Sequence, residues 1–194
     1  ANKGFLTPAT DLVDIEYTRP AYHFDSAIYE NRVFESKGEA NSAADLRFGP
    51  NIKDWPEMSQ LTDNLLIKVV SEIHDPVTTT DELIPSGETS SYRSNPLALA
   101  EFALSRKDPA YVGRAKEVQK AEAARRAGED VVGALPELKD ILDVLKRVYD
   151  ITAENTAIGS TIFAEKPGDG SAREQAASCQ KVLGGWANIS REYA

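Results

Sequence analysis

The hydrophobic pattern becomes regular at Leu61, where short apolar runs begin to alternate with helical repeats. Residues 64–70 form a short apolar run with β-branched side chains, which is typical of a buried strand. Residues 158–164 predict a second strand and residues 186–189 a third. The chain after residue 60 is therefore predicted to combine strands and helices.

Start signals predict several helices between these strands. Asn95-Pro96 places a capping side chain before a proline at the first helical position, and Asp108-Pro109 repeats that signal. The second of these helices is expected over about 110–127, with a solvated face rich in Lys, Glu and Arg. A third helix is predicted from Pro136, where apolar residues recur at helical spacing. Residues 78–87 are polar and turn-rich, and predict a loop.

The first 60 residues show no helical or strand period. Aromatic residues are scattered there among prolines and charges: Tyr17, Tyr22, Phe24, Tyr29 and Phe34. We expect residues 1–60 to form an extended linker arm with short local structure at most. The remaining residues, 61–194, are then one folded domain.

Composition narrows the classes of protein. No run of about 18 apolar residues exists, so no membrane span is expected. A net charge of −9 disfavours a nucleic-acid partner, and a cytoplasmic protein is the default expectation. The single cysteine, Cys179, excludes an internal disulfide and an all-cysteine metal site within this chain, and its spacing from Ala176 and Leu183 predicts a buried thiol. Trp55 and Trp186 are expected to pack rather than to stack on a ligand.

The segment 167–177 carries the most informative chemistry. A turn with two glycines leads into a helix that is predicted to end at Gly184-Gly185. Ser171 precedes Glu174 by three residues, the spacing of a capping box. Arg173 would oppose the helix dipole as a purely structural residue, which hints at function. The alternative is that Ser171 and Arg173 sit among free N–H groups, where they could hold a carboxylate or stabilise a deprotonated serine.

A second motif lies earlier in the chain. Thr79-Thr80-Asp81 is followed closely by Ile84-Pro-Ser-Gly87, and Arg93 lies twelve residues after the aspartate. Taken singly, these residues are caps, turn formers and a surface arginine. Their combination with the later motif is what changes the interpretation.

Together, Thr79-Thr80-Asp81, Arg93 and the Gly-Ser-x-Arg-Glu sequence at 170–174 resemble the C-terminal swivelling domain of the aconitase family. That family includes the small subunit of isopropylmalate dehydratase. The resemblance covers roughly 48–100 and 158–190. It implies an α/β fold, a swivelling β/β/α domain whose mixed sheet has flanking helices. The family domain normally continues well beyond the motif helix, so the resemblance also predicts truncation at the C-terminus.

The resemblance assigns a role to each motif residue. Ser171 falls on the serine that acts as general base, and Arg173 on an arginine beside the substrate and that base. Arg93 falls on an arginine that binds a substrate carboxylate. Asp81 falls on the aspartate that organises the site. Ala172 replaces a serine common in the family, and it keeps the backbone N–H for substrate binding.

The resemblance further implies a hydro-lyase, a hydratase or dehydratase acting on a hydroxy di- or tricarboxylate. Its 4Fe-4S cluster would be held by other domains or a partner chain, so the isolated chain is expected to be inactive. Gln175 and Glu82 stand where the family commonly has histidine, so citrate is not the expected substrate. Two alternatives stay open: a free-standing small subunit of a two-chain dehydratase, and a non-catalytic anion-binding or interaction domain.

Overall fold

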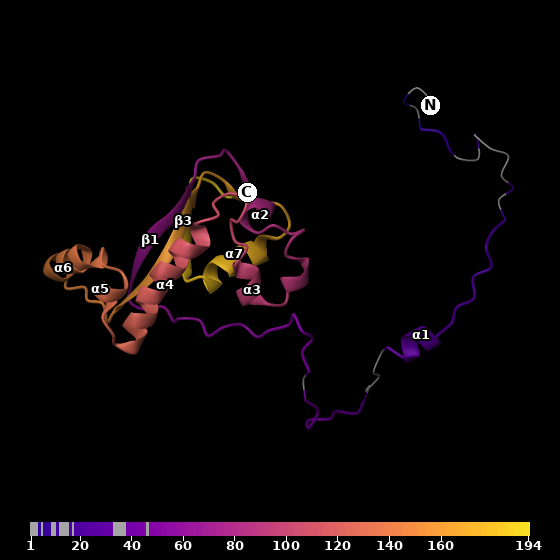
Figure 1. The fold of residues 1–194 in the computed structure, drawn as a ribbon, viewed down its shortest axis with the longest axis horizontal. Coiled ribbons are helices and arrows are strands. Elements are labelled where there is room, and N and C mark those ends of the chain that lie inside the picture. Colours follow the sequence, from indigo (N-terminus) through magenta and orange to yellow (C-terminus); the bar gives the residue numbers. More distant parts are fainter. Residues whose placement is uncertain are drawn as a thin grey trace. The chain divides into compact units, whose positions relative to one another are not determined.

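The computed structural model describes residues 4, 6–8, 11, 16, 18–32, 38–45 and 47–194. The chain divides into two units, residues 1–46 and 47–194 (Figure 1). The first unit contains the short helix α1 (Ala27–Glu30), where the Ser26 hydroxyl donates to the Glu30 carboxylate at 2.7 Å. The prediction of an extended arm was based in part on Tyr17 and Phe34, and both lie outside the described residues. The boundary after residue 60 stays a prediction.

The second unit is built on a parallel sheet. Its strands follow the order β1-β3-β5. A separate pair of short strands, β2 and β4, is also parallel. The strand bounds are β1 (Asn64–Ile73), β2 (Thr78–Thr79), β3 (Thr156–Ala164), β4 (Pro167–Asp169) and β5 (Gly185–Ser190).

Helices fill the connections between these strands. Their bounds are α2 (Thr80–Leu83), the 3-10 helix η2 (Ser90–Tyr92), α3 (Pro96–Ala100), α4 (Tyr111–Ala127), α5 (Val131–Ala134), α6 (Leu138–Tyr149) and α7 (Arg173–Val182). The mixed sheet expected from the resemblance is wrong for the described residues, because every strand pair there is parallel. Parallel neighbours need long crossovers, and the helical segments between β1 and β3 and between β3 and β5 supply them. The fold is therefore α/β, with a parallel sheet and flanking helices.

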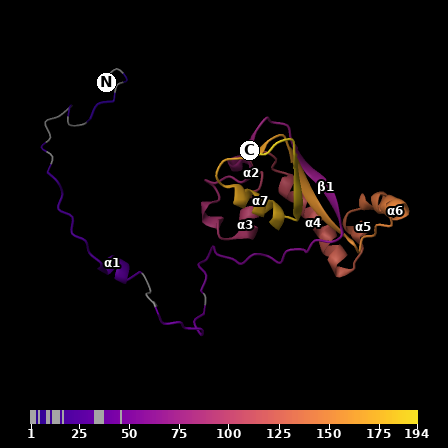
Figure 2. The same ribbon diagram turned by 180° about the vertical axis from the view of Figure 1, so that it is seen from behind.

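The core forms where α4 lies along the sheet (Figure 1). The central strand β3 is buried along almost its whole length, with Ile158 and Ile162 each at most 2% exposed. Tyr111 and Val118 of α4 are each 1% exposed, so this helix buries one face against the core in addition to its charged face. Figures 1 and 2 both show α5 and α6 on one side of α4 and the sheet, and α2, α3 and α7 on the other.

The polar segment 78–87 was expected to be a loop, and this is wrong for its first half. Thr79 and Glu82 form a capping box: the Glu82 N–H donates to Thr79 Oγ1 at 3.2 Å, and the Thr79 N–H donates to Glu82 Oε2 at 2.7 Å. These reciprocal bonds satisfy free N–H groups and nucleate the short helix α2. The Thr-x-x-Glu spacing was visible in the sequence.

The two Pro-flanked start signals have different outcomes. Asn95 caps α3 as predicted, with its side-chain oxygen accepting from the Ala98 N–H at 3.1 Å. Asp108 does not cap α4, which begins at Tyr111 without a side-chain cap. The Asp108 carboxylate instead accepts from the Ser71 hydroxyl at 2.6 Å and pairs with Arg114. A contact with β1 has replaced the local cap.

Candidate functional site

Pairing of β2 with β4 brings the two sequence motifs side by side. Thr78 lies opposite Pro167 and Thr79 opposite Asp169, although about 90 residues separate them in the chain. Gly170 follows β4 with φ +134°, and a Cβ there would lie 2.1 Å from Thr80 Oγ1. Only glycine permits both this backbone conformation and this approach. The contact fixes the start of the α7 segment against α2.

An open cleft of about 580 Å³ lies where these segments meet. Its walls come from three separate stretches of chain: the β2–α2 segment, the turn after η2, and the β4–α7 connection. Four predicted site residues line it: Asp81, Arg93, Ser171 and Ala172. All but Ala172 are exposed, so small polar molecules can reach them.

Ser171 is exposed and lines this cleft. The predicted capping box with Glu174 is wrong, because α7 begins at Arg173 with Ala172 in the cap position and without a side-chain cap. Ser171 lies one residue too early to reach the N–H that a cap must bind. Across the described part of the chain, its hydroxyl has no hydrogen-bond partner.

Arg93 supplies a positive charge to the same cleft. It follows η2 directly and is exposed. Among the described residues, no carboxylate or carbonyl pairs with its guanidinium. A planar guanidinium without an internal partner is well suited to bind a carboxylate through two parallel hydrogen bonds.

The Asp81 carboxylate is ionised, and residues of the same chain already donate hydrogen bonds to it. Its carboxylate accepts from the Ser86 N–H at 2.9 Å, from the Ser86 hydroxyl at 2.9 Å and from Arg106 Nη1 at 2.7 Å. The Ser86 hydrogen bonds, with the Arg106 charge, hold the pKa of Asp81 below its usual value. An acid held in this way positions the loop and is a poor proton acceptor.

Arg173 is not among the residues that line the cleft. Its Nε donates to the Gly170 carbonyl at 2.9 Å, and its Nη1 donates to the Ala194 carbonyl at 2.6 Å. These bonds tie the turn before α7 to the last residue of the chain. The structure therefore brings Ser171, Ala172, Arg93 and Asp81 together, and places Arg173 as a brace for their loop.

The positions of three residues in or near the cleft escaped the sequence interpretation. Arg106 pairs with Asp81 from 25 residues away, which no local pattern could indicate. Gln175 lines the cleft, although it was noted only as a departure from the family pattern. Glu82, the other departure, does not line the cleft: its carboxylate serves the α2 capping box and pairs with Lys107 at 3.2 Å.

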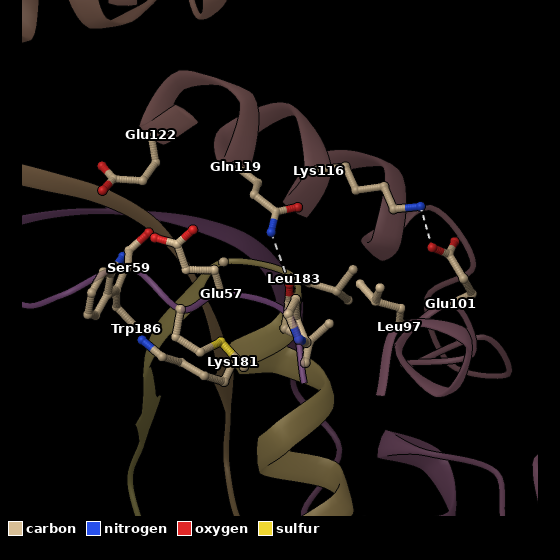
Figure 3. Close-up of a pocket in the computed structure, with 14 residues that line it drawn as sticks. Glu57, Ser59, Leu97, Glu101, Lys116, Gln119, Glu122, Lys181, Leu183 and Trp186 are labelled. Carbon is tan, nitrogen blue, oxygen red and sulfur yellow. Dashed lines mark hydrogen bonds and ion pairs between the residues drawn. The ribbon is translucent and has the colours of Figure 1, made fainter. Parts of the chain in front are cut away.

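A second pocket, of about 130 Å³, lies between α4 and the end of α7 (Figure 3). Its polar groups serve packing. Lys181 Nζ lies 3.5 Å from the centroid of the Trp186 ring, and Gln119 Nε2 donates to the Val182 carbonyl at 2.9 Å. The Trp186 ring covers Gly159, as expected for a packing residue. This pocket contains none of the predicted site residues.

The described residues of this chain do not form a site for a metal cluster. Within the described ranges, no group of three or more His, Cys, Asp or Glu side chains could hold a metal ion. Cys179 is 1% exposed, and burial raises the pKa of its thiol to about 12. In the same ranges, no helix has the length and apolar character needed to cross a bilayer.

Comparison with protein-family models, curated proteins and solved structures found no match to this chain. The fold and the cleft therefore stand on the sequence and the geometry alone.

Proposed function

We propose that this chain is the swivelling-domain part of an aconitase-like hydro-lyase, acting on a hydroxy di- or tricarboxylate. The single observation that supports the proposal is the convergence of Asp81, Arg93, Ser171 and Ala172 on one cleft. These residues come from three stretches of sequence, and the motif resemblance assigns a site role to all four. A chance set of turn and cap residues has no reason to converge.

In this proposal the chain binds a carboxylate and removes a proton. Arg93 binds a substrate carboxylate, and the Ala172 N–H at the start of α7 adds a second donor. Ser171 Oγ accepts the proton from the carbon next to a carboxylate as a double bond forms and hydroxide leaves the neighbouring carbon. A serine is a weak acid, so its alkoxide needs the positive potential of Arg93 and the α7 N-terminus. Any metal chemistry belongs to a partner domain.

A non-catalytic carboxylate-binding domain is the second candidate. It is favoured by the position of Arg173, whose guanidinium bonds to the carbonyls of Gly170 and Ala194 instead of lining the cleft. Without that charge, Ser171 has less support as an alkoxide. Such a domain would still bind a carboxylate through Arg93 but would carry out no proton transfer.

The deciding experiment uses the complete protein with its cluster-bearing partner and compares wild type with Ser171→Ala. Loss of a general base costs about 10²- to 10⁴-fold in kcat. Ser90→Ala is the matched control, because Ser90 is also exposed and does not line the cleft. Arg93→Gln should instead raise KM.

Full activity of Ser171→Ala on a substrate that the wild type converts would remove the base assignment. Carboxylate binding that requires Arg93, with no turnover of any hydroxy acid, would establish the non-catalytic candidate. Activity reconstituted only from two separately expressed chains would identify a free-standing subunit.

A further inference from the structure

Three cavities follow one another around Arg93 and Gln175. Both residues line the large polar cleft, a narrow space of about 30 Å³ beside it, and a further pocket of about 130 Å³. Leu99 also lines the two smaller spaces. Arg93 and Gln175 therefore belong to the walls of all three spaces, so a ligand held at Arg93 lies next to the further pocket. No sequence motif indicated that pocket.

The far pocket has an apolar wall. Trp55, Pro96, Leu99 and Cys179 line it. Leu99 and Cys179 are at most 4% exposed and form the buried part of the pocket wall, whereas Trp55 is 57% exposed and forms its solvent-facing part. Trp55 was expected to be a packing residue, but more than half of its surface is accessible. An apolar cavity of about 150 Å³ can take up benzene, so a space of this size accepts an alkyl group of several carbons.

The rim of the same pocket is selective. Ser178 is already satisfied, because its hydroxyl donates to the Glu174 carbonyl at 2.6 Å. The Glu174 side chain lines the pocket, is exposed, and has no ion pair with any described residue. A ligand group that carries a second negative charge would be repelled there, and an uncharged group would not.

We infer that the ligand of this cleft is a carboxylate with an apolar substituent: the carboxylate binds Arg93, and the substituent passes Gln175 into the pocket formed by Trp55, Leu99 and Cys179. The inference rests on the carboxylate-binding half of the proposed function, and it excludes a tricarboxylate whose third carboxylate would meet Glu174. It does not depend on Ser171 acting as a base.

The test measures binding of three probes to the full 194-residue chain by amide chemical-shift titration. The probes are propanoate, hexanoate and hexanedioate. Each buried methylene is worth about fourfold in affinity, so hexanoate should bind at least about tenfold tighter than propanoate. Hexanedioate, of equal length but charged at both ends, should bind at least about fivefold more weakly than hexanoate. Shifts should concentrate at Arg93, Leu99 and Gln175.

Variants separate the two ends of the site. Arg93→Gln should weaken propanoate and hexanoate alike, and Arg147→Gln on α6 is the matched control. Ser178→Phe, which fills the pocket, should reduce hexanoate to the affinity of propanoate and leave propanoate unchanged. Trp55→Ala removes an exposed wall with little risk to folding, and should weaken hexanoate alone. Glu174→Gln should narrow the gap between hexanoate and hexanedioate.

Equal affinities for propanoate and hexanoate would overturn the inference, as would a chain-length effect that persists in both Ser178→Phe and Trp55→Ala. Either result would leave carboxylate binding at Arg93 intact. Conversely, if Ser171→Ala retains full activity and the wild-type chain still binds hexanoate more tightly than propanoate, the hydro-lyase proposal fails and the inference stands. If hexanedioate binds as tightly as hexanoate, Glu174 does not exclude a second carboxylate from the pocket.

Discussion

Replacing Gly170 with alanine should destabilise the second unit, because the substitution combines backbone strain with a steric clash. Gly170 has φ +134°, a region that costs a residue with a Cβ about 1–3 kcal/mol. The added Cβ would also lie 2.1 Å from Thr80 Oγ1, and Thr80 is 6% exposed, with little room to move. Overpacking of this kind costs roughly 1–3 kcal/mol. The expected loss in the free energy of unfolding is therefore about 2–6 kcal/mol.

Urea denaturation, followed by circular dichroism, measures this loss as a shift in the unfolding midpoint. Two other glycines divide the effect into its parts. Gly168 has φ +102° and no atom within 4 Å of a built Cβ, so Gly168→Ala should cost the strain alone. Gly87→Ala meets neither problem and should stay within about 0.5 kcal/mol of wild type.

A double-mutant cycle tests the clash directly. In a Thr80→Ala background, where the Oγ1 atom is absent, the cost of Gly170→Ala should fall to that of Gly168→Ala. If Gly170→Ala matches wild type, or if its cost is the same with and without the Thr80 hydroxyl, then the close approach of the two motif segments is not what holds the cleft together.

Three further predictions follow from other contacts. Glu122→Ala should lower the free energy of unfolding, measured by urea denaturation, by about 3 kcal/mol, because it removes the carboxylate partner of Arg125, whose side chain is 11% exposed, and the acceptor of the buried Ile158 N–H; an effect below about 1 kcal/mol would refute this. Burial raises the pKa of the Cys179 thiol from 9.0 to about 12, so the unfolded chain loses this proton first as pH rises; stability should fall between about pH 9 and 12, and Cys179→Ala should flatten that fall. The lowered pKa of Asp81 should rise toward its usual value in Ser86→Ala, measured by carboxyl NMR titration; an unchanged pKa would show that the hydroxyl bond contributes nothing.

Local patterns determined the principal strands and some helix boundaries of the second unit. The apolar runs located β1, β3 and β5, since burial of a strand needs only a short stretch of suitable side chains. Asn95 capped α3 as predicted, and the glycines after α7 ended it, because caps act over three or four residues. The burial of Cys179 followed from its spacing on one helix face.

The tertiary structure alone decided how the site is assembled. Pairing of Thr79 with Asp169 joins segments about 90 residues apart, and that pairing depends on the packing of the whole sheet. The helix α7 begins at Arg173 with Ala172 in the cap position, so Ser171 does not form the capping box that its spacing allowed. The Arg173 guanidinium bonds to the backbone oxygen of Ala194, because a long side chain binds whichever partner the fold brings within reach. Sequence spacing can therefore name the residues of a cleft, but only long-range contacts decide which of them face it.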